Sequence, residues 1–158
     1  MTIFGIDPGS ERTGYGVVEK LPRTKLKCLE YGCIVTPRTK SRAERLLILE
    51  RKLSSLLVKT KPDAGAVESL FFFKNLKTAM PVSEARGVAL LALAKRKIPA
   101  YEFSPLQIKM AVAGYGRAEK KQVQYMVKEI LRLEAIPKPD DAADGLAVAI
   151  ACSLALRG

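Results

Sequence analysis

The sequence predicts an α/β fold in which a mixed five-stranded sheet is flanked by helices. Two observations support this prediction. Short apolar segments separated by tight turns occupy the first 35 residues, a pattern typical of antiparallel strands. After them, helical hydrophobic spacing alternates with short apolar runs, and strands joined through a helix are usually parallel. With 158 residues, 48% of them hydrophobic, the chain is expected to form a single domain, residues 1–158.

The five strands follow from these apolar segments. Residues 2–6, 15–19 and 26–35 are joined by short connections and should form three antiparallel strands. Residues 64–67 follow a helical segment, so this fourth strand should lie parallel to the first one. Residues 99–103 are expected to form the fifth strand.

Helices are expected over residues 41–60, 82–97, 106–113, 119–133 and 141–156. Ser41, with Glu44 three residues later, matches a capping box. Ser104 before Pro105 matches an N-cap followed by the first helical position. Pro81 is expected to mark the end of the loop before the second helix. The last helix is rich in alanine, so it should lie close against the sheet.

The helix expected at 82–97 is apolar on more than one face. Gly87 lies there among Ala85, Ala89 and Ala92, small residues that permit the close approach of another backbone. Two interpretations remain open: a helix buried in the core, and a contact between two copies of the chain.

The chain is strongly basic, with a formal net charge of +11 and a pI near 9.7. This balance favours a polyanionic partner, although many basic proteins bind none. There is no histidine, so acid-base or metal chemistry must use carboxylates, lysines or water. Cys28, Cys33 and Cys152 lack metal-binding spacing and are expected to be reduced, mostly buried thiols. Because neither a leader pattern nor an apolar run of ~20 residues is present, we expect a cytoplasmic protein.

Asp7 is the first candidate functional residue. It ends an apolar run and is followed by Gly9, Gly14 and Gly16 in the stretch IDPGSERTGYG. A carboxylate at a strand end beside a Gly-rich turn can hold a cation, whereas the plainer interpretation is an ordinary hairpin turn. Glu68 ends the fourth expected strand, so the two carboxylates should emerge at the same edge of the sheet.

A second group of acids, in PDDAADG, begins the last expected helix. Asp141 and Asp144 are three residues apart and share a helical face. Asp140 shares a face with Asp144 as well, but we expect Asp140 to be the helix N-cap. Capping and compensation of the helix dipole would account for Asp140 and Asp141. They account poorly for Asp144, which precedes an apolar stretch.

Four carboxylates brought together would repel one another unless cations lay between them. Because the group contains no imidazole or thiolate, the preferred ion is Mg²⁺, with Mn²⁺ as a substitute. Two such ions, ~3.5–4 Å apart, can activate a water molecule and stabilise the leaving oxygen of a phosphodiester. The predicted reaction is nucleic-acid hydrolysis, and the predicted catalytic metal ligands are Asp7, Glu68, Asp141 and Asp144.

Taken together, these motifs resemble the RuvC family of Holliday junction resolvases. The resemblance rests on IDPG followed by TGYG, on Glu68 with Phe71 three residues later, on AEKKQV at 118–123 and on PDDAADGLAVAI at 139–150. It implies a ribonuclease-H-like fold, a homodimer with two ions per subunit, and Mg²⁺-dependent paired nicking of four-way DNA junctions in recombination and repair. The four acids match the family's metal-binding acids, and some relatives use histidine where this chain has Asp141.

Residues expected to contact DNA surround these acids in the sequence. Three consecutive aromatics, 71–73, cannot all face one way from an extended backbone, so at least one should be exposed and able to stack on an unpaired base. Core packing is the alternative. Phe71 matches the family's base-contacting aromatic. Lys109 and Lys120 match family lysines linked to DNA binding or catalysis; without the resemblance, each would be interpreted as a solvated surface lysine. The predicted contacts are Phe71, Phe72, Lys74, Lys77, Lys109, Lys120 and Lys121.

Two other functions remain open. The acids specify phosphodiester chemistry but not the shape of the substrate, so a ribonuclease-H-like nuclease with another substrate is possible. A non-catalytic basic module that binds nucleic acid is the other alternative, with acids that only cap helices and pair with cations. The resemblance further implies cooperation with the RuvA and RuvB branch-migration complex.

Overall fold

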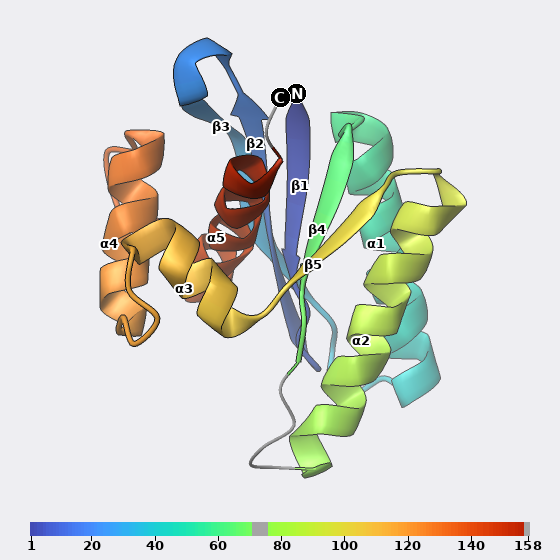
Figure 1. Cartoon of the computed structure of the whole chain (residues 1–158). Helices are drawn as coiled ribbons and strands as arrows, with labels where there is room; N and C mark the ends of the chain where they lie inside the picture. The colour runs from blue at the N-terminus through green and yellow to red at the C-terminus, as the bar shows by residue number, and fades with distance from the viewer. Residues whose placement is uncertain (71–75, 157–158) are drawn as a thin grey trace.

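A computed structural model describes residues 1–70 and 76–156 of the chain. Its five strands form one sheet in the order β3-β2-β1-β4-β5 (Figure 1). The strands β1, β2 and β3 are antiparallel, and β4 and β5 run parallel to β1. The strands are β1 Thr2–Asp7, β2 Arg12–Lys20, β3 Leu26–Val35, β4 Ala64–Glu68 and β5 Ala100–Phe103. The predicted mixed sheet is therefore confirmed.

The helices are α1 Arg42–Thr60, α2 Leu76–Lys95, α3 Pro105–Ala113, α4 Lys120–Leu131 and α5 Asp140–Ala155, with a short 3-10 helix at Pro22–Thr24. The predicted capping box of α1 forms, because the Glu44 N–H donates to the Ser41 hydroxyl at 3.2 Å and the Ser41 N–H donates to the Glu44 carboxylate at 2.8 Å. Ser104 caps α3 as predicted. No helix within the described residues is both long and apolar enough to cross a membrane.

Two predicted helix boundaries were wrong. The helix α2 begins at Leu76 and includes Pro81, which the sequence had placed at the end of a loop. A proline inside a helix removes one hydrogen bond and crowds the carbonyl four residues earlier, and the burial of Ala85, Ala89 and Leu93 further along α2 offsets this cost. The N-cap of α5 is Pro139, and Asp140 is already the first helical residue. Asp140 instead accepts a hydrogen bond from Lys138 Nζ at 3.1 Å.

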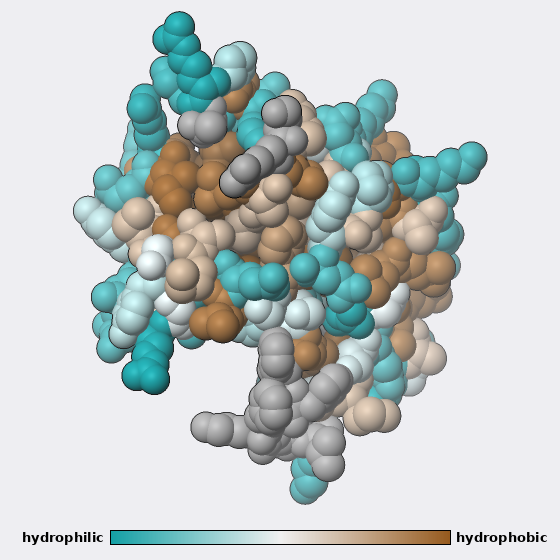
Figure 2. All heavy atoms as spheres, in the orientation of Figure 1, coloured by the Kyte–Doolittle hydropathy of each residue, from teal (hydrophilic) through white to brown (hydrophobic). Residues whose placement is uncertain are grey.

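The sheet separates two hydrophobic layers. Successive residues of a strand face opposite sides, so Phe4 packs toward α1 and α2 while Ile3 packs toward α5. Figure 1 shows α1 and α2 on one side of the sheet and α3, α4 and α5 on the other. In Figure 2, the lobe formed by α3 and α4 carries hydrophobic and hydrophilic side chains side by side. All three cysteines are free; Cys152 is buried, whereas Cys28 and Cys33 are only partly buried.

The helix α5 lies unusually close to β1 and β2, as its alanine content predicted. A Cβ atom at Gly14 would lie 1.8 Å from the Asp141 carbonyl oxygen, and one at Gly145 would lie 2.5 Å from the Tyr15 backbone. Only glycine permits these approaches. They bring the first turns of α5, with their acids, to the strand end that carries Asp7.

Candidate active site

Two of the predicted acids end neighbouring parallel strands. Ile6 of β1 pairs with Val67 of β4, and the next residue of each strand is Asp7 or Glu68. Both carboxylates therefore leave the sheet at the same edge, as predicted. They are partly buried, and the protonated Asp7 carboxyl donates a hydrogen bond to Glu68.

A cavity of about 250 Å³ opens over this edge. Asp7, Glu68 and Asp144 line it together, and two basic residues, Lys109 of α3 and Lys120 of α4, face the same space. The wall is completed by Pro105, Ile108, Val123 and Ala147. The structure thus combines three of the four acids with two of the predicted DNA-contacting lysines.

The two α5 acids predicted as metal ligands, Asp141 and Asp144, are each paired with a cation. Lys120 Nζ lies 3.0 Å from Asp144 Oδ2, and Arg12 Nε lies 2.9 Å from Asp141 Oδ2. Asp141 does not line the cavity, but its charge still acts on Asp7. Asp141 therefore lies at the border of the site rather than in its centre.

The electrostatics show an excess of negative charge at the strand ends. Burial, the hydrogen bond with Glu68, and the charges of Glu68, Asp144 and Asp141 raise the pKa of Asp7 to about 9. Burial and the charge of Asp144 raise the pKa of Glu68, although the bond with Asp7 and two lysines oppose the shift. Burial also raises the pKa of Asp144, against the effect of Lys120. A bound cation would relieve this repulsion.

The donor set suits a hard divalent cation, since it consists of carboxylate oxygens alone. Within residues 1–70 and 76–156, no group of three Asp, Glu or Cys side chains has an arrangement that could hold a metal ion without rearrangement. The ion pairs explain part of this, because Asp141 and Asp144 are turned toward Arg12 and Lys120. The residues fit Mg²⁺ in chemistry, and these pairs would have to rearrange around it.

Comparison with known proteins agrees with this arrangement. A family model described as "Crossover junction endodeoxyribonuclease RuvC" matches residues 3–152. The chain belongs to the RuvC family. The protein named crossover junction endodeoxyribonuclease RuvC in Ruminiclostridium cellulolyticum is 56% identical over 95% of this chain and 90% of its own length. That of Petrotoga mobilis is 53% identical over 94% of this chain and 91% of its own length.

Solved structures extend the comparison to three dimensions. Thermus thermophilus RuvC superposes with a TM-score of 0.88 at 35% identity, covering 98% of this chain and 95% of that one. A second structure, T. thermophilus RuvC in complex with Holliday junction substrate, also gives a TM-score of 0.88, at 32% identity and the same coverage. The yeast mitochondrial Holliday junction resolvase Ydc2, 15% identical with a TM-score of 0.66, shares the fold.

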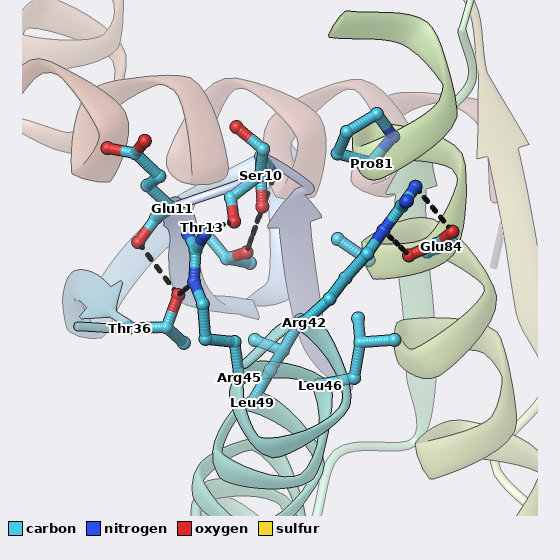
Figure 3. Close-up of a pocket in the computed structure, with 12 residues that line it drawn as sticks. Ser10, Glu11, Thr13, Thr36, Arg42, Arg45, Leu46, Leu49, Pro81 and Glu84 are labelled. Atoms are coloured by element: carbon cyan, nitrogen blue, oxygen red, sulfur yellow. Dashed lines mark hydrogen bonds and ion pairs between the residues drawn. The ribbon is translucent and has the colours of Figure 1, made fainter. Parts of the chain in front are cut away.

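In this RuvC-family chain, the turn after Asp7 is held by a residue that the sequence did not single out. Arg45 of α1 donates from Nη2 to the Ser10 carbonyl at 2.6 Å and from Nε to the Thr36 hydroxyl at 3.1 Å (Figure 3). Next to it, Arg42 pairs with Glu84 of α2 at 2.6 Å. Both arginines line a cavity of about 220 Å³. Nothing local distinguishes Arg45 from other arginines on α1.

The remaining predicted DNA contacts fall in different places. Lys77 is exposed in the first turn of α2, and Lys121 is exposed on α4 but lines a groove other than the acidic cavity. The predictions for Phe71, Phe72 and Lys74 lie outside the described residues.

Proposed function

We propose that this protein resolves four-way (Holliday) DNA junctions by hydrolysing one phosphodiester bond in each of two strands. The observation that carries the proposal is the convergence of Asp7, Glu68 and Asp144 with two lysines around one cavity, in a chain of net charge +11. Membership of the RuvC family supports the endonuclease activity. The T. thermophilus relative solved with Holliday junction substrate supports the choice of substrate.

The metal would be held by the carboxylates of Asp7, Glu68, Asp144 and Asp141. Two Mg²⁺ ions per subunit, for which Mn²⁺ could substitute, would supply water activation and charge stabilisation at the scissile phosphate. The chain's own residues have separate tasks. Lys109 and Lys120 would bind the DNA phosphate at the cavity. Lys120 would also orient Asp144, with which it is paired.

Paired cuts require two sites related by a twofold axis, and we propose a homodimer for this reason. The exposed face of α2 supports the proposal. Ala85, Ala89 and Ala92 are buried in the core, so they do not serve a dimer contact. In contrast, a Cβ added at Gly87 would meet no described atom within 4 Å outside its own stretch of helix, and Leu91 is 55% exposed. This leaves a small-residue and apolar surface open for a second copy.

We further propose that the protein acts in the cytoplasm, in recombination and DNA repair, together with the RuvA and RuvB branch-migration complex. A nuclease with this substrate acts where chromosomal DNA is exchanged. Branch migration is the process that moves a junction to a cleavable position. These assignments rest on membership of the RuvC family.

Cleavage of a labelled synthetic four-way junction, compared with a linear duplex of the same sequence, tests the proposal. We expect wild type to place paired symmetric nicks in the junction with Mg²⁺ and not with Ca²⁺, and Asp144→Asn to bind the junction without cutting it. Binding without cleavage by wild type in Mg²⁺ or Mn²⁺ would leave a basic nucleic-acid-binding module. Equal cutting of the linear duplex would leave a nuclease with a different substrate.

A further inference from the structure

A second hollow is lined by the end of α3, the turn that follows it and the helix α4. It has a volume of about 410 Å³, and its wall includes Tyr115, Lys121, Gln122, Tyr125 and Met126. We name it the tyrosine groove. No residue of the proposed catalytic site lines it, so its composition needs a separate explanation.

Two aromatic rings in the groove are open to solvent. Tyr115 is 54% exposed and Tyr125 is 53% exposed. Tyrosine has an apolar body and a polar tip, and exposed rings of this kind offer flat faces on which a base or sugar can pack. Lys128 Nζ lies 5.9 Å from the centre of the Tyr125 ring, so a positive charge already lies over this ring.

The charges around the groove favour an anionic ligand. Lys121 and the nearby Arg117 are exposed, and neither forms an ion pair within the part of the chain that the structure describes. Of the neighbouring acids, Glu129 pairs with Lys128 at 3.2 Å, and the backbone N–H of Glu119 donates to the Gln122 side chain at 2.7 Å. The groove therefore presents aromatic rings beside two cations, Lys121 and Arg117, which outnumber the single carboxylate of Glu119.

The groove and the acidic cavity are both lined by residues of the helices α3 and α4. Lys120 faces the cavity and pairs with Asp144, whereas the next residue, Lys121, lines the groove. Helix α3 likewise contributes Lys109 to the cavity and Ala113 to the groove. In Figure 1, the α3–α4 turn points toward the same end of the molecule as the strand ends of β1 and β4. A polyanion bound in the cavity would pass the groove.

We propose that the tyrosine groove binds the DNA strand that adjoins the scissile phosphate. Lys121 and Arg117 contact phosphates of that strand, and Tyr115 and Tyr125 pack against its sugars or bases. This inference deepens the proposed function and rests on it, because it assigns a second binding region to the same substrate. An apolar peptide is a poorer match, since it would leave the two cations without partners.

The test measures junction binding with Ca²⁺ by fluorescence anisotropy, for wild type and for a Tyr115→Ala, Tyr125→Ala double variant. We expect the dissociation constant to rise by about tenfold or more, given the contribution of stacking per base. Tyr31→Ala is the matched control, because Tyr31 is 40% exposed on β3, away from the groove. Equal melting temperatures of the variants exclude a loss of fold.

A charge variant tests the same groove without altering its packing. Lys121→Gln should lower the slope of log Kd against log salt by about one, whereas Lys27→Gln on β3 should leave the slope unchanged. Wild-type DNA affinity in the tyrosine variant, together with an unchanged salt slope in Lys121→Gln, overturns the inference, whatever other partner the groove binds.

The result is separable from the proposed function. Binding is also measured on a linear duplex, so the groove is tested even if wild type cuts no junction. Failure of cleavage by wild type refutes the nuclease, while unchanged binding by the groove variants refutes only the groove.

Discussion

The acids of the proposed site on the strands, Asp7 and Glu68, and those on α5, Asp141 and Asp144, are held in opposite ways. Asp7 and Glu68 extend from adjacent parallel strands and are partly buried, and neither forms an ion pair with a cation within residues 1–70 and 76–156. Asp141 and Asp144 keep 29% and 25% of their side chains exposed, and each forms an ion pair.

The difference indicates which carboxylates of the proposed site would gain most from a bound metal ion. The strand acids are fixed by the sheet and repel each other, so they gain most from a divalent cation. The helix acids already have Arg12 and Lys120 as partners, which an incoming ion must displace. We therefore expect the strand acids to be the primary ligands and the helix acids to adjust around the ion.

The strongest test removes one strand acid. Asp7→Asn should lower the rate of junction cleavage in Mg²⁺ on the order of 10³-fold, because the carboxylate is a proposed metal ligand at the reacting phosphate. Junction binding in Ca²⁺ should persist. Asp140→Asn is the matched control, since Asp140 is exposed, does not line the cavity and forms its ion pair with Lys138. If Asp7→Asn kept more than about a tenth of the wild-type rate, Asp7 would not have this role.

The second test follows stability against pH in EDTA-treated protein. The folded-state pKa of Asp7, about 9, exceeds the ordinary value of 3.8. The folded state then binds this proton more tightly than the unfolded state, so the stabilisation is complete below pH 3.8 and is lost as the pH rises through about 9. We expect the free energy of unfolding to fall with pH across this window, by up to about 1.4 kcal/mol per unit.

Urea denaturation at a series of pH values measures this effect. Asp7→Asn should lack this part of the slope and should be more stable than wild type at neutral pH without metal. Saturating Mg²⁺ should flatten the wild-type curve, because the ion stabilises the ionised carboxylate. Equal slopes for wild type and variant would show that Asp7 ionises normally in the folded protein.

The third test loosens the turn between Asp7 and Arg12. Arg45 holds Ser10, which lies between Asp7 and the Asp141 partner Arg12. Arg45→Met should lower kcat about tenfold, the cost of roughly one well-placed hydrogen bond to a charged group, with little change in junction affinity. Arg45→Lys should recover part of the loss. A similar loss in Arg51→Met, an exposed position on the same helix, would argue against a specific role for Arg45.

The smallest expected effect concerns the helix acids. Arg12→Gln removes the partner of Asp141, and exposed ion pairs are worth ~0.2–1 kcal/mol. The Mg²⁺ concentration for half-maximal cleavage should therefore fall by up to about fivefold. Arg38→Gln is the control, because Arg38 pairs with Glu11 instead. An unchanged or higher Mg²⁺ requirement would mean that Arg12 does not compete with the ion for Asp141.

The sequence by itself determined the strands, the capped helices and the four acids. These depend on short-range signals: the caps at Ser41 and Ser104 need residues three positions away, and Asp7 and Glu68 are read directly from the ends of apolar runs. Their motifs also indicated the family. The expected convergence of Asp7 with Glu68 followed from one crossover between parallel strands.

Only the tertiary structure decided how the acids are partnered and what holds them in place. Arg12 and Asp141 are 129 residues apart, and Arg45 reaches Ser10 over 35 residues. Packing also kept Pro81 inside α2, against its local preference. Contacts of this kind depend on how close α5 and α1 come to the sheet, and glycine-permitted approaches such as that of Gly14 to Asp141 set this distance. No local pattern records such distances, because they arise from packing between segments that are remote in the chain.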